Sequence, residues 1–180
     1  NGDSAVKKYE RKFNGRKTLQ LRVSEKEIKE ARSKTRYEER EALTELWSMS
    51  FWSFFMSDFL QKIPSKRYSF VPIPSVGCYI PGGQARYPSS AAMSIIPARQ
   101  AGVKRIVVVS PPGRDGKIDP LTILTAKWCG ATEIYKAGGA QAIGALAYGT
   151  KSIPKVDKIV GPGGKFVSIA KSLVSDQTAI

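Results

Sequence analysis

The chain has 180 residues, of which 42% are hydrophobic, enough for one globular domain or two small ones with a sizeable core. It contains no histidine, which excludes serine–histidine, cysteine–histidine and histidine–zinc chemistry within these residues. The 29 Lys and Arg outnumber the 15 Asp and Glu, and the net charge of +14 favours anionic partners. No basic-aromatic RNA-binding signature or zinc finger accompanies that charge, so the sequence does not favour nucleic-acid binding.

Two further features bear on the cellular compartment. The sequence has no run of about 18 apolar residues, and its first residues lack the order of a signal peptide, which argues against a membrane protein or a secreted one. Cys78 and Cys129 lie far apart, and neither has a second cysteine nearby. We therefore expect two reduced thiols in or near the core of a cytoplasmic protein.

The first 62 residues have helical patterns. Gly2-Asp3 can begin a helix that runs through Phe13, and Asn14-Gly15 predicts a turn after it. Apolar residues alternate over 19–23, which is typical of a short strand. The dense charges of residues 1–40 resemble solvated helix faces.

Two more helices are predicted before the chain composition changes. Ser24 and Glu27 form a capping box, in which each side chain bonds the backbone amide of the other residue, so a helix should begin near Glu25. Apolar residues spaced by three and four over 43–59 predict another helix with a broad apolar face. Prolines over 63–74 cannot continue a helix, and we set a domain boundary near residue 75.

From residue 75 onward, short apolar strands alternate with helices. This order predicts a parallel sheet with crossover helices on its faces, whose ligands gather at the carboxyl ends of the strands. The predicted strands are 76–80, 105–110, 133–136 and 158–160, and the predicted helices begin near 89, 120, 140 and 165. The expected fold class is therefore α/β: a helical segment over 1–74, followed by a Rossmann-like parallel sheet domain over 75–180.

Glycine-rich loops follow several of the predicted strands. Paired glycines let the backbone approach a ligand closely, and a helix that begins in such a loop can present amides to an anion. Neither the GxGxxG dinucleotide fingerprint nor the GxxxxGK[ST] phosphate loop is present. These loops are Gly77-Cys78-Tyr79-Ile80-Pro81-Gly82-Gly83, Gly138-Gly139-Ala140-Gln141 and Gly161-Pro162-Gly163-Gly164.

Together these loops resemble the histidinol dehydrogenase family. Further motifs in family order are Tyr87-Pro88-Ser89-Ser90, Ser110-Pro111-Pro112, Ala147-Tyr148-Gly149-Thr150 and Val156-Asp157-Lys158. The match is close over 75–180 and loose over 1–62. The resemblance implies an NAD-dependent, zinc-containing oxidoreductase that converts L-histidinol to L-histidine in two hydride transfers through an aldehyde.

The resemblance also implies which residues contact NAD. Tyr79 matches the NAD-contacting tyrosine of the family, and Gln141 matches its NAD-contacting glutamine. Gly164 stands where the family has an NAD-contacting asparagine, so the chain offers only backbone at that position. Losing one such bond costs about 1–3 kcal/mol when a polar partner is left unpaired.

The acid/base pair and the zinc ligands of the family follow the part that this sequence matches, so we name no catalytic residue and no metal ligand. The expected partners are therefore a C-terminal half, L-histidinol and a second copy in a homodimer. One alternative is a stand-alone nucleotide-binding or regulatory module without the chemistry. Another, suggested by charge alone, is a basic nucleic-acid-binding protein.

Overall fold

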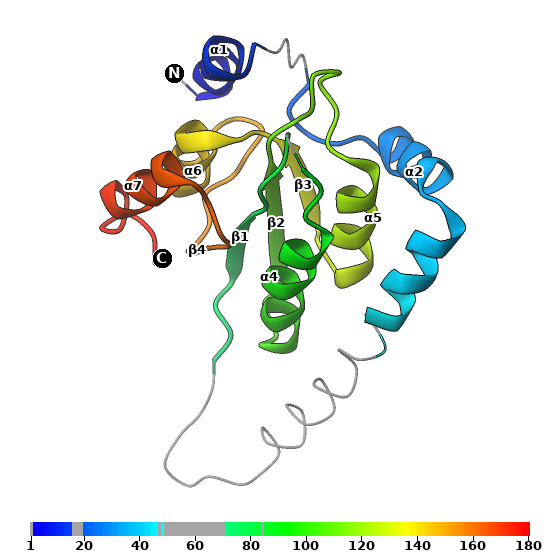
Figure 1. Ribbon diagram of the computed structural model, residues 1–180. Coiled ribbons are helices and arrows are strands. Elements are labelled where there is room, and N and C mark those ends of the chain that lie inside the picture. Colours follow the sequence, from blue (N-terminus) through cyan, green and yellow to red (C-terminus); the bar gives the residue numbers. More distant parts are fainter. Residues whose placement is uncertain (1, 16–19, 47, 49–70, 84) are drawn as a thin grey trace, which may run out of the picture.

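A four-stranded parallel sheet lies at the centre of the protein (Figure 1). The computed structural model describes residues 2–15, 20–46, 48, 71–83 and 85–180. Within them the sheet has the order β3-β2-β1-β4. Its strands are β1 (Ser75–Tyr79), β2 (Arg105–Ser110), β3 (Glu133–Lys136) and β4 (Lys158–Val160). The α/β class with a parallel sheet is confirmed, and all four strands lie where the sequence predicts them.

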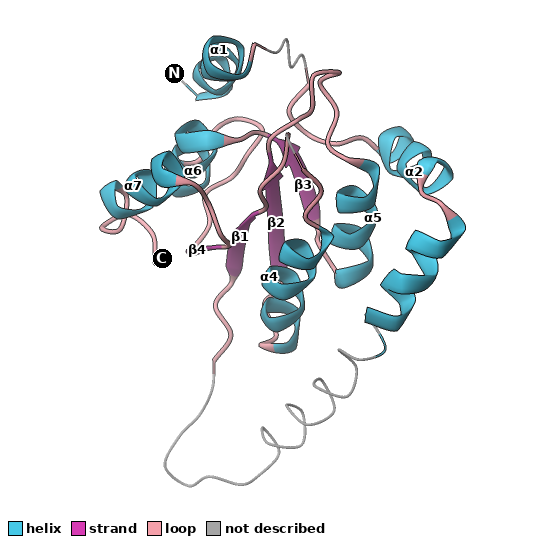
Figure 2. Ribbon diagram, viewed as in Figure 1, coloured by secondary structure: helices cyan, strands magenta, loops and turns pink. Residues whose placement is uncertain are grey.

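Helices cover both faces of this sheet (Figure 2). One face packs against α6 and α7 and the other against α4 and α5, while α1 contacts α6 and α2 contacts α5. The helices are α1 (Gly2–Asn14), α2 (Glu25–Lys34), α4 (Pro88–Gln100), α5 (Pro120–Cys129), α6 (Gly139–Tyr148) and α7 (Lys165–Leu173). Residues 37–46 are also helical.

Strand β2 shows why both faces of the sheet are buried under helices. Val107 and Val109 belong to the core under α6 and α7, whereas Ile106 and Val108 belong to the core under α4 and α5. Successive side chains of a strand point to opposite faces, so a continuous apolar run predicts burial on both. All four side chains are at most 2% exposed, which fits this pattern.

Local sequence signals set the helix ends. The predicted capping box is confirmed: Ser24 accepts from the Glu27 amide at 3.3 Å, and the Ser24 amide donates to Glu27 at 2.9 Å. Asp119 caps α5 by accepting from the Thr122 amide at 3.0 Å. Gly130 ends α5 at φ 112°, a left-handed conformation that favours glycine.

The segment before α2 runs along the outer edge of β3. The Val23 amide donates to Ile134 O at 2.8 Å, and the Lys136 amide donates to Leu21 O at 2.7 Å. Only Arg22 forms a bridge, antiparallel to Tyr135, so the strand predicted over 19–23 is reduced to a single pair in the described residues. Residue 19 lies outside them.

Several expectations fall partly outside the described residues. The aromatic residues of the predicted 43–59 helix lie outside, as do residues 63–70 of the proline-containing segment. These aromatic residues are Trp47, Phe51, Trp52, Phe54, Phe55 and Phe59. Within the described residues, exposed apolar side chains gather on α7, where Phe166 is 76% and Leu173 74% exposed. No described helix is long and apolar enough to cross a membrane.

Asp3 links α1 to the loop after α6 through hydrogen bonds. Its carboxylate accepts hydrogen bonds from Thr150 Oγ1, from Ser152 Oγ and from the Ser152 amide. Burial opposes the charged form, but these hydrogen bonds outweigh it and hold the pKa of Asp3 below its ordinary value. A carboxylate whose pKa is lowered by folding stabilises the protein above its unfolded pKa, and that stabilisation disappears as the pH falls through the folded pKa.

We therefore expect Asp3→Asn to reduce the free energy of unfolding at pH 7 by less than about 1 kcal/mol, because the carboxylate is partly exposed. The difference between wild type and variant should shrink as the pH falls from about 5 to about 3, across the ordinary range of an aspartate. Urea unfolding at each pH measures this. Glu41→Gln, at an exposed glutamate, is the control, and a pH-independent difference for Asp3→Asn would contradict the assignment.

Candidate cofactor site

The order in which the chain adds strands reverses at β1. This reversal creates a topological switch point at the carboxyl end of β1. The chain passes from β1 to β2 and β3 on one side, and reaches β4 on the other side of β1. Loops that leave β1 and β4 therefore diverge to opposite faces of the sheet. In open α/β sheets, ligands bind in the crevice outside the strand ends at such a point. Tyr79 ends β1, and the 161–164 loop follows β4.

The Tyr79 side chain turns from β1 toward the start of α6. Its hydroxyl oxygen accepts a hydrogen bond from the Gly139 amide at 3.2 Å, and the residue is 5% exposed. Burial raises the pKa of Tyr79, and the negative charge of Glu10 raises it further, so the phenol is neutral at physiological pH. Its ring is part of the core, so in the described residues Tyr79 offers no open face on which a ligand could stack.

Gln141 lies in the first turn of α6, and its partner is a carboxylate from α1. Gln141 Nε2 donates to Glu10 Oε1 at 2.8 Å, and the Gly138 amide donates to the same oxygen at 2.7 Å. Glu10 is fully buried. The interpretation of the dense charges of residues 1–40 as solvated helix faces therefore does not hold at Glu10, whose buried carboxylate accepts a hydrogen bond from the Gly138 amide before α6.

These contacts limit which ligand groups can bind at the start of α6. The Gly138 amide is bonded to Glu10 and the Gly139 amide to Tyr79. An incoming diphosphate would find both amides taken and a carboxylate next to them. The prediction that this helix start presents open amides to an anion therefore does not hold for the Gly138 and Gly139 amides.

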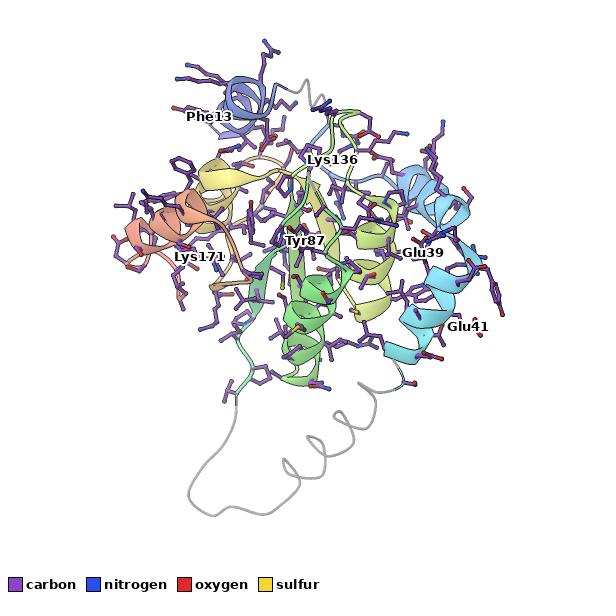
Figure 3. The ribbon with its side chains drawn as sticks, in the orientation of Figure 1. Phe13, Glu39, Glu41, Tyr87, Lys136 and Lys171 are labelled. Atoms are coloured by element: carbon purple, nitrogen blue, oxygen red, sulfur yellow. The ribbon has the colours of Figure 1, made fainter. Side chains whose placement is uncertain are left out.

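The loop after β4 reaches across the end of β1. A Cβ atom on Gly161 would lie 2.1 Å from Tyr79 O, and Gly161 has φ 101°. The loop can approach β1 this closely only because residue 161 is glycine. Lys171 of α7 (Figure 3) also contacts this loop, because its Nζ donates a hydrogen bond to Gly161 O at 2.8 Å. Burial lowers the pKa of this ammonium.

Gly164 precedes α7 at the same edge of the sheet. It is exposed and extended, with φ −71°, and a Cβ atom there would have no neighbour within 4 Å. The structure describes no side-chain hydrogen bond that caps α7. At the start of α7 no side-chain cap therefore competes for the amides, whereas the Gly138 and Gly139 amides at the start of α6 are bonded.

Two other polar groups lie at the strand ends. Lys136 ends β3 with a side chain that is 8% exposed, and its ammonium is 2.8 Å from Glu27 Oε1 of α2 (Figure 3). Ser110 ends β2, is 1% exposed, and its hydroxyl has no hydrogen-bond partner in the described structure. A Cβ on Gly82 would lie 2.9 Å from Ser110 Oγ, so the Gly82-Gly83 loop lies directly against this hydroxyl.

The described residues offer no assembled metal site. None of their cysteine or carboxylate side chains form a group of three that could hold an ion. Cys78 and Cys129 are free and buried, as predicted. Burial raises the pKa of Cys78 to about 12 and that of Cys129 to about 11, which keeps both as neutral thiols.

A second groove of about 700 Å³ lies between the start of β1, α4 and β4, and it reaches Gly161 of the loop after β4. Its lining includes Pro72, Met93, Pro97 and Val160, and it contains none of Tyr79, Gln141 and Gly164. The lining is mostly apolar, and the Lys158 ammonium that lies in it already donates to Ile180 O at 3.3 Å, so the groove is poorly suited to a diphosphate. We therefore keep the candidate cofactor site at the switch point.

A parallel sheet with this strand order and with helices on both faces defines a Rossmann-like α/β protein. Comparison with known proteins narrows that class. The family model for histidinol dehydrogenase matches residues 1–180, and the chain belongs to this family.

Individual relatives agree with the family match. Histidinol dehydrogenase from Methanothermobacter thermautotrophicus is 45% identical over 186 residues, covering 99% of this chain and 43% of the relative. The Bacillus licheniformis enzyme is 45% identical over 199 residues and is covered to 44%. The crystal structure of histidinol dehydrogenase from Elizabethkingia anophelis matches with a TM-score of 0.85 at 35% identity, covering 99% of this chain and 43% of that chain. The chain thus spans less than half the length of these relatives.

Proposed function

We propose that this chain forms the NAD-binding part of a histidinol dehydrogenase, with the cofactor at the switch point. The observation that carries the proposal is the meeting of Tyr79, Gln141 and the 161–164 loop at the carboxyl edge of the sheet. Bound NAD would accept hydride in the oxidation of L-histidinol to L-histidine. The residues of this chain would bind and orient the dinucleotide, with its diphosphate at the open start of α7.

The remaining parts of the activity belong to the proposal as well. The zinc of the family finds no ligand set among the described residues, so we derive no step through it. We propose that L-histidinol and the acid/base chemistry meet this chain through a further portion of the enzyme. Residues 1–74 would then complete a first domain with that portion, and 75–180 would be the cofactor domain. A homodimer in the cytoplasm is the expected assembly.

The test is a calorimetric titration of NAD into the wild type and two variants at position 164. Gly164→Asn fits the open space there and adds a side-chain amide at the start of α7, which can cap the helix or bond the cofactor. Because one well-placed hydrogen bond contributes about 1–3 kcal/mol, we expect NAD to bind roughly 5- to 150-fold more tightly.

Gly164→Ala is the matched control, since it adds the same Cβ without an amide and should not strengthen binding. The wild type should bind weakly, in the high micromolar range or above. Equal affinities for Gly164→Asn and Gly164→Ala would argue against NAD contact at this position. Absence of binding by all three proteins would contradict the proposed function.

A further inference from the structure

Glu10 and Gln141 form a pair whose geometry fixes what the site can recognise. Glu10 Oε1 accepts from the Gly138 amide, which can only donate, so this oxygen acts as an acceptor. Gln141 lies 2.8 Å from the same oxygen and must turn its NH2 group toward it. The opposite orientation would bring two acceptor oxygens together inside the core.

The oxygen of the same amide then points elsewhere. A Cβ atom on Gly139 would lie 3.0 Å from Gln141 Oε1, so this oxygen lies over the Cα of Gly139, where φ 60° and the missing side chain leave room. Gln141 is partly exposed, and no described residue donates a hydrogen bond to Oε1. The free acceptor is therefore beside Gly139, whose amide is bonded to the Tyr79 hydroxyl at the carboxyl edge.

We propose that Glu10 is a positioning residue that makes Gln141 present an oxygen to the ligand, so that the part of the dinucleotide bound there is a hydrogen-bond donor. This inference rests on the proposed function. Ribose hydroxyls and the amide or amine groups of the two bases are such donors. Phosphate oxygens accept hydrogen bonds and are negative, so Oε1 of Gln141 and the carboxylate of Glu10 disfavour them at this corner.

Two variants test which group residue 141 presents to the ligand. In Gln141→Glu a second carboxylate faces Glu10, and we expect NAD affinity to fall at least about 10-fold, the order of effect of one lost charged hydrogen bond. In the double variant Glu10→Ala/Gln141→Glu, the carboxylate at 141 no longer faces a second carboxylate and still presents an acceptor to the ligand. NAD should therefore bind at least about 3-fold more tightly to the double variant than to Gln141→Glu.

Calorimetric titration with NAD distinguishes the two possible roles of Gln141. If the ligand needed a donor from residue 141, the double variant would stay at least as weak as Gln141→Glu, because a carboxylate cannot donate. That result would overturn the proposal. Thermal melts of both variants show whether a weak binder is still folded, and Glu41→Gln, at an exposed glutamate, is the control for a removed carboxylate.

A second measurement is independent of NAD. The side-chain NH2 signals of Gln141 in a 15N–1H NMR spectrum should exchange slowly in the wild type, and should move toward those of exposed glutamines in Glu10→Ala. Unchanged Gln141 signals in a folded Glu10→Ala protein would show that Glu10 does not orient the amide. If the wild type binds no NAD, the proposed function fails, and this spectrum still decides the orientation of Gln141.

Discussion

Gly161→Ala should lower the free energy of unfolding by roughly 3 kcal/mol or more, and urea unfolding followed by circular dichroism measures this loss. The new Cβ would lie 2.1 Å from Tyr79 O and 3.0 Å from Tyr79 C, and both are backbone atoms that cannot rotate away. The φ of 101° adds strain for any residue with a side chain. The loop after β4 would have to leave the end of β1, and NAD binding should be lost with it.

Gly144→Ala is the matched control for this substitution. Gly144 lies within α6, and a Cβ there would meet nothing within 4 Å. Alanine is a better helix former than glycine, so this variant should be about 0.5–1 kcal/mol more stable than wild type. Opposite signs for the two glycine substitutions are expected. A Gly161→Ala protein as stable as wild type would refute the close contact between the 161–164 loop and β1.

No NADH should form when the 180-residue chain alone is mixed with NAD and L-histidinol, with or without zinc. Removing hydride from an alcohol requires a base that takes the hydroxyl proton, and the chain has no histidine for that role. The buried thiols have raised pKa values, and Glu10 and Glu27 are already bonded within the fold. Absorbance at the NADH band measures the reaction directly.

A complete histidinol dehydrogenase in the same buffer is the positive control for that assay. Histidinol-dependent NADH from this chain would contradict the expectation. Adding the separately produced remainder of the Bacillus licheniformis relative distinguishes the two enzyme-related alternatives. Recovered turnover favours a cofactor-binding part of the enzyme, whereas NAD binding without any recovery favours a nucleotide-binding module that lacks the chemistry.

The strands and most helices of the sheet domain could be predicted because their signals are local. β2 is a continuous apolar run, Asp119 and Ser24 cap their helices, and Gly130 ends α5. Each of these features depends on residues within a few positions of one another. The segment at 20–23 was less predictable, since its pairing depends on the outer edge of β3, more than 100 residues later in the chain.

The candidate site was predictable only in part. The family resemblance singled out Tyr79, Gln141 and Gly164, and parallel topology with the glycine positions predicted that they lie at one edge of the sheet. Glu10 was missed because it lies in a charge-rich helix, where a single buried carboxylate looks like its solvated neighbours. Its role depends on α1 packing against α6, a contact between residues 128 positions apart at Glu10 and Gly138. The available signal was Val6, an apolar residue four positions earlier on the same helix face.

The most direct test of the cofactor site is a 15N–1H NMR titration of the labelled chain with NAD. The account predicts the largest shifts at the backbone amides of Gly139, Gln141 and Lys165, around the switch point. The NAD concentration should be raised to about 10 mM. A weak site with a dissociation constant of about 1 mM, or about −4.1 kcal/mol, is then mostly occupied. Shifts confined to Met93, Ala98 and Val103 in the apolar groove, or no shifts at all, would contradict a cofactor site at the carboxyl end of β1.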